Sequence, residues 1–426
     1  MSAIVARLRA LSSREAGENT RRLLKGLASV GPYFILARAL TALAQVAAGR
    51  WLGPSEFGLV TLILAASGVL VVLLQQSFSW AVVKFAAMEK TDEGRRAVVS
   101  TNFWLQILWT GACGLLLFLL RRPAAAALRL PPPLYPWCLA YTGVLVFYTF
   151  VSSALQGVLL FDARGKVEFL YGASALALFA AACRVFPRGF ADFIGAMDAA
   201  LILAGAACLY ALRGYLSFDL SRRAAADGAA YLLPNFVSSC GGVVIQSALP
   251  LILASYMAPR EIGYFGAYEM GTIGVMMVVV NVVVSVLAPL ASRPEKQRGV
   301  WKKFFLLALP AAAGLFAFFC ASEFVILKLI GRGYPVDPAW VAVFSAAAVA
   351  DFFFFCAVNL VILRDAAGAW YALVGNYLAS AGAVAASLWA VPRYGIVGAA
   401  LALAIGYAAG FAWSASWGWA RVRADE

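Results

Sequence analysis

The sequence predicts an all-α protein that crosses a membrane many times and is built from two copies of one helical unit. Hydrophobic residues make up 63% of the 426-residue chain and charged residues 13%, whereas a soluble chain has roughly 45–50% and about 25%. Apolar runs of roughly 18 or more residues recur along the whole length, and each can cross a hydrocarbon core of about 30 Å. A short polar motif between such runs occurs twice, which predicts an internal duplication.

The repeated motif is the feature around which the chain is organised. Its first copy, residues 49–58, reads GRWLGPSEFG, and its second, residues 255–263, reads SYMAPREIG. Each copy closes one apolar run and opens the next. An offset of 205 residues aligns Pro54 with Pro259, Glu56 with Glu261 and Gly58 with Gly263. We therefore expect both motifs to be hinges between consecutive spans.

Hydropathy predicts twelve spans. They lie at about residues 28–48, 58–80, 97–120, 134–157, 168–186, 191–212, 229–257, 262–291, 303–327, 338–363, 370–391 and 394–417. The polar, Ala-rich segment 213–228 separates the two copies. The predicted organisation is an N-terminal segment 1–27, an N-lobe 28–212 with six spans, a linker 213–228, a C-lobe 229–419 with six spans, and a tail 420–426.

Charge orients the chain. If the N-terminus is cytoplasmic, the inner segments hold 23 Lys and Arg and the outer loops 10. Basic residues favour the cytoplasmic side of a membrane, so we expect the N-terminal segment, the linker and the tail to be cytoplasmic. The net charge of +13 is explained by these loops, and we expect no nucleic acid partner.

Sites of bond chemistry are not predicted. The chain has no histidine, and its seven cysteines are scattered through apolar runs without a metal-ligand spacing. It carries no phosphate-binding loop of the G-x-x-x-x-G-K-[ST] type. The outer loops are too short for a catalytic domain. We expect no catalytic residue, no cofactor and no metal site, and predict that the protein is not an enzyme.

Polar residues form stripes inside the spans. Arg38 lies near the centre of the first span, and Thr41 and Gln45 share its helical face. A charge at mid-bilayer costs about 2.5–3.5 kcal/mol, so it usually faces protein or water. Further stripe residues are Asn102, Gln106, Asn235, Ser239, Gln246 and Asn376. Such groups can simply hydrogen-bond between helices, at about 0.6 kcal/mol each, but several stripes together favour a wet cavity between the lobes.

Three acidic residues lie within spans, Asp198, Glu269 and Asp351. An ionisable residue at this depth is a functional candidate. We expect these acids to be candidates for proton or sodium coupling. Lys84, at the cytoplasmic end of the second span, is a candidate for attracting an anionic headgroup.

The motif residues resemble a known family. The run 49–58 is similar to the signature of bacterial polysaccharide biosynthesis flippases, in the multidrug/oligosaccharidyl-lipid/polysaccharide exporter superfamily. Further similarities are Pro259, Glu261 and Gly263, the Gly331-x-x-Tyr334 pair and the run 394–400. They cover nearly the whole chain in the right order.

The resemblance implies two six-helix lobes related by pseudo-twofold symmetry about the membrane normal. It implies a flippase that moves undecaprenyl-pyrophosphate-linked oligosaccharide, such as an O-antigen or exopolysaccharide unit, between leaflets of the bacterial cytoplasmic membrane by alternating access. The central cavity would be cationic. Implied partners are the lipid-linked oligosaccharide, membrane lipids, and the glycan polymerase and glycosyltransferases.

Two other functions stay open at this point. A cation-coupled multidrug exporter has the same fold, and an inert membrane scaffold in glycan assembly would need no transport. Accumulation of glycan on the inner leaflet of a deletion strain distinguishes the flippase from both. The driving force is also open, since carrying two negative charges outward gains about 4–5 kcal/mol at 100 mV without any coupling ion.

Overall fold

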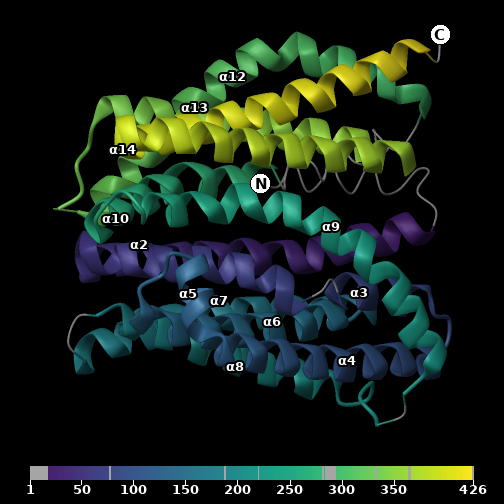
Figure 1. The fold of residues 1–426 in the computed structure, drawn as a ribbon. Coiled ribbons are helices and arrows are strands. Elements are labelled where there is room, and N and C mark those ends of the chain that lie inside the picture. Colours follow the sequence, from purple (N-terminus) through teal and green to yellow (C-terminus); the bar gives the residue numbers. More distant parts are fainter. Residues whose placement is uncertain are drawn as a thin grey trace.

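The computed structural model describes residues 18–75, 78–186, 189–218, 220–280, 283, 294–331, 333–362 and 366–424. Within these ranges the chain forms helices and no strand. The long helices run side by side along one direction (Figure 1). The bundle therefore has two ends. We call the end that holds Gly53, the start of α10 and Gly395 the hinge end (left in Figure 1), and the opposite end the linker end.

The first half of the chain supplies α2 Glu18–Gln75, α3 Phe78–Met88, α4 Asp92–Leu119, α5 Arg121–Ala127, the 3₁₀ turn η1 Pro132–Leu134, α6 Tyr135–Gly157, α7 Phe161–Val185 and α8 Phe190–Leu212. The second half supplies α9 Arg222–Leu253, α10 Pro259–Glu269, the π-helix η2 Met270–Gly274, α12 Pro294–Ile330, α13 Pro338–Ile362 and α14 Ala366–Ala424.

The apolar helices match the twelve predicted spans. Among the described residues, nine helices are long and apolar enough to cross a membrane, and Cys240–Leu253 in α9 is a shorter apolar stretch. Two of the nine, with 44 and 52 residues, can each cross twice, because one crossing takes about 20 residues. They bend at Gly53, with φ 75°, and Gly395, with φ 60°, a conformation open to glycine. Pro54 then starts the second helix, as its fixed φ favours.

Helix bounds confirm the duplication. Adding 205 to the bounds of α6 gives 340–362, and α13 is Pro338–Ile362. The same shift places α4 inside α12, and it moves the first residue of α7 to 366, where α14 begins. The chain is an all-α membrane protein of two six-helix lobes with pseudo-twofold symmetry. We call α2–α8 the N-lobe and α9–α14 the C-lobe; the exact limits predicted for the lobes and terminal segments stay predictions.

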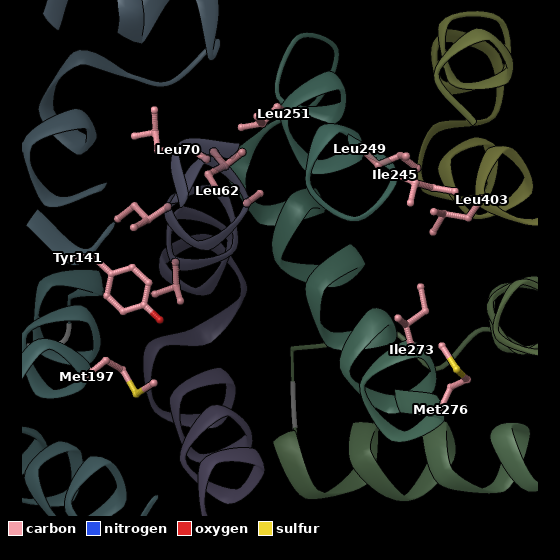
Figure 2. Packing of buried hydrophobic residues seen from close by; sticks show 14 of the residues in the cluster. Leu62, Leu70, Tyr141, Met197, Ile245, Leu249, Leu251, Ile273, Met276 and Leu403 are labelled. Carbon is pink, nitrogen blue, oxygen red and sulfur yellow. The ribbon is translucent and has the colours of Figure 1, made fainter. Parts of the chain in front are cut away.

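The buried core continues from one lobe into the other. Figure 2 shows Ile245 and Leu249 of α9 pointing toward Leu403 of α14, all within the C-lobe. On the other side of α9, Leu62 of α2 contributes to the same cluster of buried residues. Helices α2 and α9 therefore form the centre of the molecule, with the rest of each lobe behind them.

The segment that joins the lobes packs on α4 at the linker end. The Ser100 hydroxyl donates to the carbonyl of Tyr215 at 2.9 Å, and the Trp104 indole donates to the carbonyl of Ser217 at 2.9 Å. Helix α9 begins at Arg222, inside the predicted linker, because the Ser221 side chain accepts from the Ala224 amide and caps it. The segment between α8 and α9 therefore ends at residue 221, whereas the predicted linker extends to residue 228.

Candidate functional site

A cavity of about 310 Å³ lies where the two lobes meet. Its walls come from both halves of α2, from α9, and from α10 with the π-helix η2 that follows it, and α8 contributes Phe193. Most lining residues are apolar. The polar ones are Gln45, Thr61, Ser247 and Glu269. The arrangement is typical of a ligand site, an apolar surface with a few placed polar groups.

Local structure positions each polar group. The Thr61 hydroxyl donates to the carbonyl of Phe57 at 3.0 Å, one turn earlier in α2. Ser247 of α9 lies against Gly68 of α2, where a methyl group would come within 3.3 Å of the Ser247 Cβ. Glu269 is the last residue of α10, directly before η2. Short π-helical turns occur preferentially at functional sites, and this one follows Glu269 directly in the cavity wall.

The cavity lies on the pseudo-twofold axis. Positions 205 residues apart occur together in its wall, with Gln45 matched by Pro250 and Leu64 by Glu269. Because equivalent positions face each other across a twofold axis, the acid of the C-lobe faces a leucine of the N-lobe. The cavity is therefore asymmetric in charge about that axis.

The charge of the cavity differs from the expectation. The resemblance implies a cationic passage, but among the described lining residues the one ionisable side chain is the acid Glu269. Arg38 is exposed on the side of α2 that faces α7, where its guanidinium lies 5.2 Å from the Phe34 ring centroid and its charge acts on Tyr171. The Thr41 hydroxyl donates to its own helix, to the carbonyl of Ala37 at 3.1 Å. Arg38 and Thr41 therefore do not line the cavity, which Gln45 reaches two turns further along the same helical face.

The predicted residues of α4 are buried between helices. Asn102 is 0% and Gln106 2% exposed. The Gln106 amide donates to the carbonyl of Leu74 at 2.8 Å and so joins α4 to α2, and the Asn102 amide donates within α4 to Val98 at 2.9 Å. The side-chain oxygen of each of these two amides has no hydrogen-bond partner in the described structure. They do not line the cavity in this conformation.

Of the remaining predicted substrate residues, the structure describes the side chains of two, Asn376 and Lys84. The side chains of Asn235, Ser239 and Gln246 lie outside those that the structure describes. Asn376 is half-buried on α14 opposite Gly241 of α9, where an added methyl group would lie 3.4 Å from its Cβ. Lys84 lies over the Phe85 ring at 5.4 Å. The structure thus brings Gln45 and Glu269 together, from the first and eighth predicted spans.

The C-lobe contains a group of buried acids. Asp351 of α13 accepts a hydrogen bond from Tyr407 of α14 and lies within electrostatic range of Glu269. In the N-lobe, Asp198 of α8 is half-buried, and one of its carboxylate oxygens has no partner among the described residues. A buried charge without a partner is costly, so such a carboxyl group is suited to holding a proton or a small cation.

Sequence reasoning missed a fourth acid, Glu323 of α12. It is 0% exposed, accepts from the Ser345 hydroxyl at 3.4 Å and leaves its other oxygen unpaired in the described structure. Its Cα lies against Gly271 of η2, 2.9 Å from where a Cβ would be. The rule that singled out Asp351 applies equally to an acid near the end of the ninth predicted span, so the signal was present. Thr61 and Ser247 gave no signal, since small hydroxyl residues are common in helix contacts.

Comparisons with known proteins identify relatives of the whole fold. The profile of the family described as "Polysaccharide biosynthesis protein" matches residues 48–335. Among solved structures, the chain is similar to an inward-facing conformation of a multidrug resistance MATE family transporter of the MOP superfamily, with a TM-score of 0.64, 14% identity, and coverage of 92% of this chain and 94% of that one.

Two further structures are similar over nearly their full length. An outward-facing conformation of a multidrug resistance MATE family transporter has a TM-score of 0.60 at 15% identity, covering 94% of this chain and 96% of that one. A MOP superfamily transporter from Pyrococcus furiosus has a TM-score of 0.62 at 14% identity, covering 96% and 99%. The reverse polarity of the binding pocket in that transporter suggests a different function for it. No protein of curated function matches the sequence.

Proposed function

Because the chain belongs to the polysaccharide biosynthesis protein family, we propose that it moves an oligosaccharide linked to undecaprenyl pyrophosphate across a bacterial cytoplasmic membrane. It has the fold of MOP superfamily transporters. The direction is from the inner to the outer leaflet, and both chain ends lie in the cytoplasm, in agreement with the bias of basic residues toward that side.

One observation carries the proposal: a cavity on the axis that relates two lobes of equal construction. Two such lobes can rock against each other and open a central site to one side at a time. Related folds have been solved in inward-facing and outward-facing conformations. Transport by alternating access follows naturally from this geometry, whereas a scaffold would need no cavity.

The physical task is to shield polar groups. Moving a pyrophosphate and a hydrated sugar through hydrocarbon unaided would cost tens of kcal/mol. Gln45, Thr61 and Ser247 can exchange hydrogen bonds with sugar hydroxyls in the cavity, while the polyprenyl tail remains in lipid. A volume of about 310 Å³ equals that of roughly ten waters, so it accommodates a sugar residue and must widen to pass an oligosaccharide.

The polar and charged residues within the spans have separate roles in this proposal. Arg38, with Lys84 near the inner mouth, attracts the pyrophosphate, and Thr41, Asn102, Gln106, Asn235, Ser239, Gln246 and Asn376 bind glycan as the lobes open. Asp198, Glu269 and Asp351 are the candidates for ion coupling. Glycan polymerase and glycosyltransferases are the expected partners.

The proposal is tested by locating the lipid-linked glycan. Vesicles of both orientations are prepared from a deletion strain and from the same strain carrying the gene, and glycan is probed with a membrane-impermeant oxidant of sugar diols. Without the protein, the glycan should be accessible only from the cytoplasmic face. Equal access from the outer face in both strains would contradict the proposal. An Arg38→Ala variant that restores full export would remove Arg38 from the site.

The charge of the cavity favours a second candidate function. An apolar wall with one acidic group, Glu269, fits a lipophilic cation better than a pyrophosphate. A multidrug exporter would therefore explain the cavity as seen. In that case the deletion strain should accumulate a fluorescent lipophilic cation and keep normal glycan export, the reverse of the pattern expected for the flippase.

A further inference from the structure

The two copies of the repeated motif touch each other at the hinge end. A methyl group on Gly58 would overlap the carbonyl oxygen of Pro259 and lie 2.7 Å from its carbonyl carbon. A methyl group on Gly263 would overlap the carbonyl oxygen of Pro54 and lie 2.8 Å from its carbonyl carbon. Each glycine thus lies directly against the backbone of the proline in the other lobe, as small residues allow where helices cross closely.

The contact is reciprocal, and that places the symmetry axis. Gly58 and Gly263 are 205 positions apart, as are the two prolines. Residue i of one copy contacts residue j of the other and the converse also holds, which is the signature of a twofold interface. One turn deeper, Thr61 meets Gly266, again its own counterpart, where an added methyl group would lie 3.3 Å from the Thr61 Cβ. Both of these residues line the cavity.

Weak polar contacts join the lobes around this point. The Tyr334 hydroxyl donates to the carbonyl of Gly49 at 3.0 Å, and Arg129 donates to the hydroxyl of Ser255. Burial raises the pKa of Tyr334, so the hydroxyl stays a donor at neutral pH. Net hydrogen-bond contributions are about 0.5–1.5 kcal/mol each. The residues next to the two glycines, Phe57 and Ile262, are buried, and the Phe57 ring packs edge-on against Tyr334 of the other lobe with 6.5 Å between centroids. Opening at this point must therefore break polar and apolar contacts together.

We propose that Pro54, Gly58, Pro259 and Gly263, which we call the repeat contact, form the gate that closes the hinge end of the cavity. The inference rests on the proposed transport function, since it assigns the outer gate of that cycle. Closure requires glycine at both positions, because any Cβ would collide with a backbone carbonyl that cannot move without shifting its helix. This explains the hinge motif, because the proline starts each helix and the glycine one turn later contacts the proline backbone of the other lobe.

Symmetry makes the proposal specific. A methyl group at either glycine separates the same two backbones by the same route, so Gly58→Ala and Gly263→Ala should have equal effects. The double variant should add little, because residues in direct contact are not additive. A static packing contact would give the same symmetry in stability but would leave the accessibility of the cavity unchanged.

The experiment measures accessibility and needs no substrate. Ser247→Cys places a thiol in the cavity wall, and its labelling by a membrane-impermeant maleimide is followed in vesicles of both orientations, with the seven native cysteines as background. From the hinge-end side, each alanine variant should label about tenfold faster than the parent, as expected when a mostly closed gate is held open. Gly143→Ala in α6 and Gly314→Ala in α12, where a Cβ would meet nothing within 4 Å, are the matched controls and should label like the parent.

Folded alanine variants that label at the parent rate would overturn the gate. If they do not fold, Thr61→Cys with Gly266→Cys decides, since their Cβ separation of 3.3 Å is close to the roughly 3.5–4.5 Å of a disulfide. Oxidation of this pair should block labelling of Ser247→Cys from the hinge end, and reduction should restore it; labelling at equal rates in both states would also overturn the gate. A protein that shows this gating but exports no glycan would refute the proposed substrate and leave the gate intact.

Discussion

At the hinge end the N-lobe and the C-lobe present the same residues to each other, whereas deeper in the bundle their charged residues differ. Pro54 and Gly58 meet Pro259 and Gly263 reciprocally. In the cavity just below, Leu64 stands at the position equivalent to Glu269. The two copies therefore share the residues of the repeat contact and differ in the charge of the residues below it.

The acids show this divergence most clearly. At an offset of 205, Asp351 corresponds to Val146 and Glu323 to Phe118, so the buried acids of the C-lobe are absent from the equivalent N-lobe positions. The N-lobe has its own acid, Asp198, whose counterpart is Leu403. In the proposed transport cycle the movement of the lobes would therefore be symmetric, and any ion coupling would be asymmetric. Substitutions at matched positions separate the two.

The largest effect is expected in the core beneath the repeat contact. Phe265 and its counterpart Val60 are both 0% exposed, and the Phe265 ring lies 5.5 Å from that of Phe344. Phe265→Ala should cost about 3–5 kcal/mol through lost packing and a cavity, and Val60→Ala clearly less, because fewer atoms are removed. Thermal unfolding in detergent measures both. Equal losses would show that the aromatic cluster of the C-lobe adds nothing.

Removing the carboxyl group of Glu323 should stabilise the fold. One of its oxygens is buried without a partner in the described structure, and an unsatisfied buried polar group costs about 1–3 kcal/mol. Glu323→Leu should therefore raise the melting temperature while lowering transport. Phe118→Leu, at the exposed equivalent position in α4, should change neither. A lower melting temperature for Glu323→Leu would mean that its oxygen is satisfied.

Glu269 should matter more for transport than its counterpart. Glu269→Gln removes the one ionisable side chain among the described residues of the cavity wall and should slow export by about tenfold. Leu64→Gln places a polar group that does not ionise at the equivalent position and should have a smaller effect on export. Export driven by membrane potential alone would leave Glu269→Gln unchanged, and flipping in vesicles with an imposed potential distinguishes the cases.

The smallest effect is expected at Tyr334. Tyr334→Phe removes one hydrogen bond between the lobes and should weaken closure by about 1 kcal/mol, seen as faster labelling of Ser247→Cys. Burial raises the pKa of this group, so the closed state holds the proton more tightly. The contact should be constant below the ordinary tyrosine pKa of about 10 and weaken only as the pH rises through the higher value. A change between about pH 6 and 8 would have another origin, because tyrosine does not titrate there.

Much of the fold could be predicted because apolar runs and the repeated motif recur at regular intervals along the chain. Apolar runs fixed the spans, and the offset of Pro54 and Pro259 fixed the duplication. That Gly58 and Gly263 would touch each other could not be read from the chain, since it depends on where the symmetry axis passes. The sequence indicated only that both were hinge residues.

The site was harder to predict, for a physical reason. Arg38, Thr41 and Gln45 share a face by spacing, but they lie at different depths along α2. Gln45 reaches the cavity, whereas Arg38, two turns away, lies near Tyr171 of α7. The Gln106 side-chain amide donates a hydrogen bond to the Leu74 carbonyl, so this polar residue joins two helices and does not line the cavity. Only tertiary packing decides between these uses.

The most direct test is flipping of lipid-linked glycan in proteoliposomes by Thr61→Cys/Gly266→Cys, before and after oxidation. We predict that oxidation abolishes the export that the same reduced variant shows, and that reduction restores that rate. Equal export in both states would contradict the account, because the lobes would then have no need to part at the repeat contact.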